Sequence, residues 1–272
     1  MISGITAEGW ATVNVNGNVD IQVDTAANSL DSPLTDGIYL YGQATLNTAK
    51  DTTLKIRSEG TGEGVVLSAD DDDKTTPNAG VNVGFVSEGG KIEANGSVDI
   101  TSTANGGYAS GLVLQGVAGD EGWIASNKDK ITDYGSKAVF KGDLSINASS
   151  KTGRVEGIRI GGFVPFDSEK PNNGGSYMDK YQKEHRVELE TYGKTTIKAS
   201  DSSDKVESVG IYFALPEGMS VGDQYADTNL GKLTNSGVMT VEGEQAVAGE
   251  AGDFIGYVQN LVSGGDFNLV SC

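Results

Sequence analysis

A short phrase that recurs six times along the chain constrains its fold more than any other feature. In each copy, a small residue and one spacer precede two apolar or β-favouring residues that are separated by a polar one. The copies are Gly17–Ile21, Thr52–Ile56, Gly96–Ile100, Gly142–Ile146, Gly193–Ile197 and Gly237–Val241. They follow one another at steps of about 35 to 51 residues, and repetition at such a period indicates one supersecondary unit stacked on copies of itself.

Two further elements repeat in step with this phrase. One is a Gly followed by an apolar triplet or near-triplet, found at Gly37–Leu40, Gly64–Leu67, Gly111–Leu114, Gly157–Ile160 and Gly210–Phe213, with a degenerate copy near Gly252. The other is a brief alternation just ahead of the phrase, found at Val13–Val15, Leu46, Ile92–Ala94, Ala138–Phe140, Val187–Leu189 and Leu233. Each repeat therefore carries three short strands, whose side chains alternate between the inside and the outside.

The three elements recur in the same order, which favours parallel stacking, because a hairpin meander would mirror them and would need two-residue turns. Parallel crossovers are right-handed almost without exception. We therefore predict an all-β fold, a right-handed three-sided parallel β-helix of about six coils and roughly 30 Å in length. Ile100, Ile146 and Leu114 are predicted to be fully buried. We expect residues 1–272 to form a single domain that is a fragment of a longer surface protein.

The link from the Gly-apolar element to the next coil is nearly absent after Leu40 but becomes long elsewhere. The long excursions are residues 68–91, 115–137, 161–186 and 214–232. Insertions at one register of a solenoid leave it at one corner, so we expect a ledge of long loops on one flank. Aromatic residues on loops favour recognition. The predicted ligand-binding residues are Trp123, Phe163, Phe166, Tyr177 and Tyr181. Their alternative role, shared with Phe85, is to fasten the loops to the coil.

The net charge of −18 limits the classes of partner. Nucleic acid is excluded as a partner, because binding to phosphates needs clustered Lys and Arg. No run approaches the roughly 18 consecutive apolar residues of a transmembrane helix. An acidic surface keeps the protein soluble and favours cationic, neutral or Ca²⁺-bridged partners. We interpret the run Asp70–Asp73 as a solvated loop tip and not as a calcium site, because adjacent carboxylates cannot all converge on one ion.

Histidine and cysteine are too scarce for most catalytic and metal centres. His185 is the only histidine, and the single cysteine is the last residue, Cys272, so an internal disulfide is excluded. A Ser-His-Asp centre, a Cys-His centre or a zinc site would have to use this one histidine. We predict no catalytic residues, no metal and no cofactor, and hence no enzyme. Paired carboxylates for glycoside hydrolysis stay open, because acidic residues are abundant and their geometry is not readable from the sequence.

Several segments resemble the passenger regions of type V autotransporters, which are secreted surface proteins of Gram-negative bacteria. These segments are Ala44–Ile56, Gly90–Ile100 and Ser208–Phe213. The resemblance implies a right-handed β-helical passenger that is displayed outside the outer membrane and acts as an adhesin or biofilm factor. The implied partner is a host or bacterial surface protein or glycan, or a second copy of the chain. Two alternatives remain, a carbohydrate-active enzyme of the β-helix type (a polysaccharide lyase or hydrolase) and an inert structural stalk.

Overall fold

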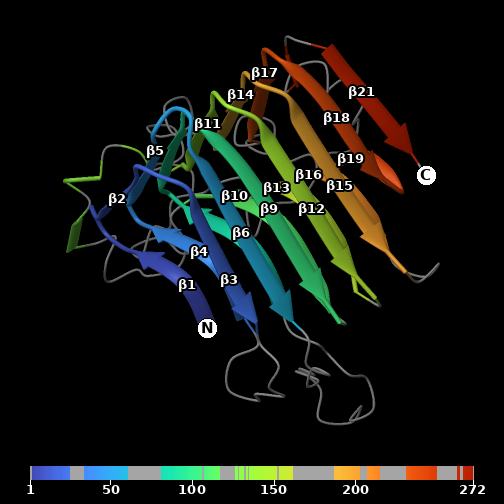
Figure 1. The fold of residues 1–272 in the computed structure, drawn as a ribbon, viewed down its shortest axis with the longest axis horizontal. Coiled ribbons are helices and arrows are strands. Elements are labelled where there is room, and N and C mark those ends of the chain that lie inside the picture. Colours follow the sequence, from blue (N-terminus) through green and yellow to red (C-terminus); the bar gives the residue numbers. More distant parts are fainter. Residues whose placement is uncertain are drawn as a thin grey trace, which may run out of the picture.

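The computed structural model shows a stack of strands that follow one another in chain order (Figure 1). It describes residues 2–24, 34–60, 81–105, 107–116, 126–127, 129–131, 133, 135–151, 153–161, 187–202, 207–214, 231–249, 262–263 and 266–271. Within these ranges every regular element is a β-strand, and every third strand along the chain belongs to the same sheet.

Three parallel sheets of seven strands each form the three sides of the molecule. Sheet A contains β1 (Ile2–Ala7), β4 (Leu34–Tyr41), β7 (Val81–Glu88), β10 (Tyr108–Gln115), β13 (Val155–Ile160), β16 (Ser208–Phe213) and β19 (Gln245–Gly249). Sheet B contains β2 (Thr12–Val15), β5 (Thr45–Thr48), β8 (Lys91–Ala94), β11 (Lys137–Phe140), β14 (Glu188–Thr191), β17 (Lys232–Asn235) and β20 (Val262–Ser263). Sheet C contains β3 (Val19–Asp24), β6 (Thr53–Gly60), β9 (Ser97–Ala104), β12 (Leu144–Ser150), β15 (Thr195–Asp201), β18 (Val238–Gly243) and β21 (Asp266–Ser271).

Each coil takes one strand from sheets A, B and C in turn, and each strand pairs in parallel with its equivalent in the next coil. This confirms the predicted fold class, a right-handed three-sided parallel β-helix. The described residues form seven strands in each sheet and hence seven coils, and not six. The estimate of six coils was wrong because it left out the C-terminal copy of the phrase, Gly265–Leu269, which has the same pattern. β21 carries this copy and completes coil 7.

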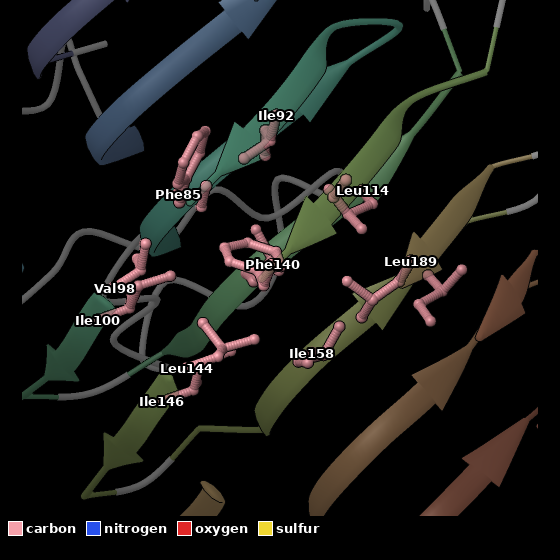
Figure 2. Packing of buried hydrophobic residues seen from close by; sticks show 14 of the residues in the cluster. Phe85, Ile92, Val98, Ile100, Leu114, Phe140, Leu144, Ile146, Ile158 and Leu189 are labelled. Atoms are coloured by element: carbon pink, nitrogen blue, oxygen red, sulfur yellow. The ribbon is translucent and has the colours of Figure 1, made fainter. Parts of the chain in front are cut away.

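The core consists of ladders in which equivalent apolar residues stack from coil to coil. One ladder in sheet C contains Ile21, Ile56, Ile100, Ile146, Ile197 and Val241. Figure 2 shows side chains from all three sheets, such as Phe85, Phe140 and Ile146, in the same interior. Ile100, Ile146 and Leu114 are at most 1% exposed, which confirms their predicted burial. The period-2 alternation of the sequence phrase is therefore what turns these residues inward.

The Gly-apolar element has a glycine at its first position for a steric reason. A Cβ atom on Gly111 would lie 2.2 Å from Cγ2 of Ile146, and one on Gly84 would lie 2.3 Å from Cγ2 of Ile100. Gly4, Gly37, Gly157 and Gly210 face the ladder of sheet C in the same way. The side chains of this ladder thus occupy the space that a side chain would need at these positions of sheet A, so coils 1 to 6 each pair one Gly with one β-branched residue.

One assigned copy of this element was wrong. The sheet A strand of coil 3 is β7, which carries Gly84 and Phe85, whereas Gly64–Leu67 lies outside the described residues. Phe85 is a fully buried core residue and therefore does not belong to a loop. The predicted excursion 68–91 is corrected accordingly, because residues 81–88 form β7 and Lys91 begins β8. Near the C-terminus, β19 takes the place in sheet A that was assigned to Gly252, which is also outside the described residues.

Candidate functional site

The five aromatic residues that the sequence analysis selected for ligand binding all lie outside the described residues. They are Trp123, Phe163, Phe166, Tyr177 and Tyr181. The run Asp70–Asp73, His185 and Cys272 also lie outside them. The structure therefore describes the coil positions from which the excursions start and end, and these positions define the candidate site.

Long connections are concentrated at one corner of the β-helix, the A–B corner, where each sheet A strand is followed by a sheet B strand. In coils 1 to 3 this corner is short and consists of residues 8–11, 42–44 and 89–90. In coils 4 to 7 it consists of residues 116–136, 161–187, 214–231 and 250–261. Four successive long connections thus leave the A–B corner. Three of them correspond to the predicted excursions 115–137, 161–186 and 214–232, whereas 250–261 was not predicted. Residues 61–80, by contrast, connect sheet C to sheet A and belong to another corner.

The described part of the first long connection contacts the short corners of the preceding coils. Ile131 belongs to the core cluster, and the main-chain oxygen of Asp133 accepts a hydrogen bond from Gln43 in coil 2. The hydroxyl group of Ser136 donates to the main-chain oxygen of Ser87 in coil 3, at 2.7 Å. Lys130 lies over the ring of Trp10 in coil 1, at 5.9 Å from its centroid. This connection therefore crosses three coils and braces them.

The outer face of sheet A, next to the A–B corner, is unusually well buried. Gly37 and Ile38 both face the core, so the inward and outward alternation of side chains along β4 is broken there. The pairing of β4 with β7 likewise includes Asp36 and Ile38 but skips Gly37. The outward positions on either side of this break form two rows. The row before it contains Ser3, Asp36, Val83, Ser110, Glu156 and Val209. The row after it contains Tyr39, Val86, Val113, Arg159 and Tyr212.

Around coils 2 and 3, the outer face of sheet A carries two carboxyl groups in unlike surroundings. Glu88 accepts hydrogen bonds from Tyr39 at 2.9 Å and from Gln115 at 2.6 Å. Burial raises the pKa of Glu88, and these two hydrogen bonds oppose the rise. Asp36 is 0% exposed, and neither of its carboxyl oxygens has a hydrogen-bond partner. Burial, together with the negative charge of Glu88, raises the pKa of Asp36 to about 7.

Around coils 4 to 6, the same face carries a buried carboxylate that lies against two arginines. Glu156 is 0% exposed and lies 3.0 Å from Arg154 and 3.0 Å from Arg159. The hydroxyl group of Tyr108 donates a hydrogen bond to the same carboxylate. The two guanidinium groups also lie over the ring of Tyr212, at 4.3 Å and 5.0 Å from its centroid. Two guanidinium groups and one hydroxyl group therefore surround this single buried carboxyl group.

The sequence analysis missed the buried carboxyl groups of Asp36 and Glu156. A usable signal was present, because Asp36 and Glu156 each come directly before the Gly of the Gly-apolar element, and Arg159 interrupts an otherwise apolar triplet. Neither carboxyl group contacts solvent, because both residues are fully buried. Among the described residues, no three His, Cys, Asp or Glu side chains are grouped as metal ligands would be. In the same ranges, no helix is long and apolar enough to cross a membrane.

No family model, no curated protein and no solved structure matches the chain. The fold and the geometry of the A–B corner are therefore the basis for assigning a function.

Proposed function

We propose that this chain is a surface-displayed adhesive module that binds a host or bacterial surface ligand, or a second copy of itself, through the A–B corner. The observation that carries the proposal is the series of four long connections on coils 4 to 7, which leave the same corner of successive coils. A rod that repeats one corner presents the attached loops side by side. Loops held by a rigid scaffold are the usual place for recognition residues.

The resemblance to autotransporter passenger regions supports this proposal, because it implies display outside the outer membrane of a Gram-negative bacterium. The net charge of −18 favours a cationic, neutral or Ca²⁺-bridged partner. At a net charge of −18, two copies repel one another at long range, so self-association needs short-range contacts through the loops.

A pair of loop deletions tests the proposal. In the first variant, residues 162–186 are replaced by one Gly, which leaves a three-residue link between β13 and β14, as long as residues 42–44 in coil 2. In the matched control, residues 61–80 at the C–A corner are replaced by three residues, the length that joins β9 to β10. Circular dichroism and thermal melting establish that both variants keep the β-helix.

Aggregation of protein-coated beads and their adhesion to cells are then measured. We expect the native chain and the control to aggregate or adhere, and the variant that lacks residues 162–186 to do neither. Binding that survives this deletion with the fold intact would show that the A–B corner is not the binding surface. Native-chain beads that neither aggregate nor adhere would favour an inert stalk.

A further inference from the structure

The inward side chains of coil 1 are less buried than those of coils 2 to 6. Within the described part of the molecule, β1 pairs with β4 alone. The inward residues Ile5, Val13, Val19 and Ile21 of coil 1 are only partly buried. Their equivalents in coil 2, Ile38, Leu46, Leu54 and Ile56, are 0% exposed. Coil 1 thus gains less from apolar burial than coils 2 to 6, and we expect it to open before them.

Asp36 lies at this junction. It pairs in register with Ser3 of β1 and has no exposed surface. Both of its carboxyl oxygens and the hydroxyl oxygen of Ser3 are buried without a hydrogen-bond partner. An ionised carboxylate that is buried and unpaired costs far more free energy than a protonated one. The stability of the junction between coils 1 and 2 therefore depends on the protonation state of Asp36.

The same row of sheet A shows how the other coils avoid this cost. Val83 and Val209 occupy the equivalent positions in coils 3 and 6 and carry no charge. Glu156 occupies it in coil 5 and is paired with two arginines. Arg159 follows Glu156 by three residues in coil 5, and the equivalent position in coil 2 is occupied by Tyr39, which carries no positive charge. Among the described residues, Asp36 is the one acid of this row with no basic side chain against it.

The charged and titratable groups that act on Asp36 favour its protonated form. Glu88 of β7 repels the ionised carboxylate, and only the positive amino terminus opposes this effect. Tyr39, on the same strand, donates its hydroxyl group to Glu88 and so leaves Asp36 without a donor. The strand β1 has no charged side chain.

We propose that Asp36 is a pH-sensitive switch that holds coil 1 on coil 2 while it is protonated and releases coil 1 when it ionises. Release would expose the unpaired edges of β4, β5 and β6, which are templates for pairing with another chain. This role is independent of the adhesive function.

The sign and the pH window follow from the raised pKa of Asp36. Its value is about 7 in the folded chain and 3.8 ordinarily. A raised carboxyl pKa means that the folded state binds more protons than the open state between these values. The closed junction is therefore most stable below pH 3.8 and loses stability as the pH rises to about 7. Above that pH no further loss is expected from this group.

Hydrogen exchange of the whole chain tests the switch. Protection of residues 2–24 is compared with that of residues 91–105 at pH 5 and pH 8, after correction for the intrinsic exchange rate. We expect the protection of coil 1 to fall at least tenfold between the two pH values, while residues 91–105 keep theirs. Asp36→Val, which copies the residue at the equivalent position of coil 3, should abolish this pH dependence, whereas Asp20→Asn, at an exposed carboxylate of coil 1, should preserve it.

A second variant keeps the test decisive if Asp36→Val disturbs the strand. Tyr39→Arg places a guanidinium group three residues after Asp36, as Arg159 is placed after Glu156. Coil 1 should then stay protected at pH 8. The proposal is overturned if the native chain shows no pH dependence in coil 1, or if that dependence persists in both variants.

Discussion

Replacing Gly111 by alanine should destabilise the β-helix by a steric clash inside one coil. The new Cβ would lie 2.2 Å from Cγ2 of Ile146 and 2.7 Å from the main-chain oxygen of Gly157. Carbon atoms in contact are ordinarily about 3.5 to 4.0 Å apart. Ile146 is 1% exposed and the second neighbour is backbone, so neither has room to withdraw.

The expected loss of unfolding free energy is the difference between a cost in the folded state and a gain from restricting the unfolded state. Overpacking a rigid core costs about 1 to 3 kcal/mol, and the short contact places this site near the upper end. Alanine also restricts the unfolded chain, which returns about 0.4 to 1 kcal/mol. The net loss of unfolding free energy should therefore be about 2 kcal/mol.

Equilibrium unfolding in urea measures this loss, and Gly17→Ala is the matched control, because a Cβ on Gly17 has no atom within 4 Å. The control should be neutral or slightly stabilising. In an Ile146→Ala background, most of the cost of Gly111→Ala should disappear, while the contact with Gly157 should retain part of it. A Gly111→Ala variant as stable as the Gly17→Ala variant would refute the steric explanation.

Three further predictions concern the core, the buried polar network and the acidic run. Ile146→Ala should cost about 2 to 5 kcal/mol in urea unfolding, because it leaves a cavity in a stacked ladder, and an unchanged midpoint would contradict that burial. Asn82→Ala should cost about 1 to 3 kcal/mol by the same assay, because Asn82 donates at 2.8 Å to the main-chain oxygens of both Ser58 and Thr103; a loss below 0.5 kcal/mol, roughly the scatter for a surface site, would speak against that network. Changing Asp70–Asp73 to asparagine should leave the melting temperature unchanged with or without Ca²⁺, whereas a chelator-sensitive transition that vanishes in the variant would reveal a bound cation.

The order of the coils could be predicted because each copy of the recurring phrase contains a small residue at a corner and then apolar and polar residues that alternate along a strand. The error at Gly64 shows the limit of this approach. Gly64–Leu67 matches the apolar triplet better than Gly84 and the residues after it, in which Ser87 breaks the pattern. The strand is fixed instead by its neighbours, since Phe85 pairs with Ile38 and with Leu112.

The polar groups of sheet A could not be placed from the sequence for a different reason. Strict alternation would put Asp36 on the same side of β4 as Ile38, that is, in the core. The break at Gly37 turns Asp36 outward, and only the close approach of the isoleucine ladder explains that break. A local pattern does not contain this contact, because Ile56 belongs to another strand of the coil.

The measurement that tests the coiled architecture most directly is a set of spin-label distances along one outward row of sheet C. Lys55, Ser145, Thr196 and Thr240 lie in this row, and the last three are two, three and four coils apart from Lys55, respectively. Labels are introduced in pairs with Lys55 in a Cys272→Ser background. With strands about 4.8 Å apart, the label separations should rise in the order of about 10, 14 and 19 Å. Separations that do not increase by one strand spacing per coil would contradict the seven-coil β-helix and every inference that depends on it.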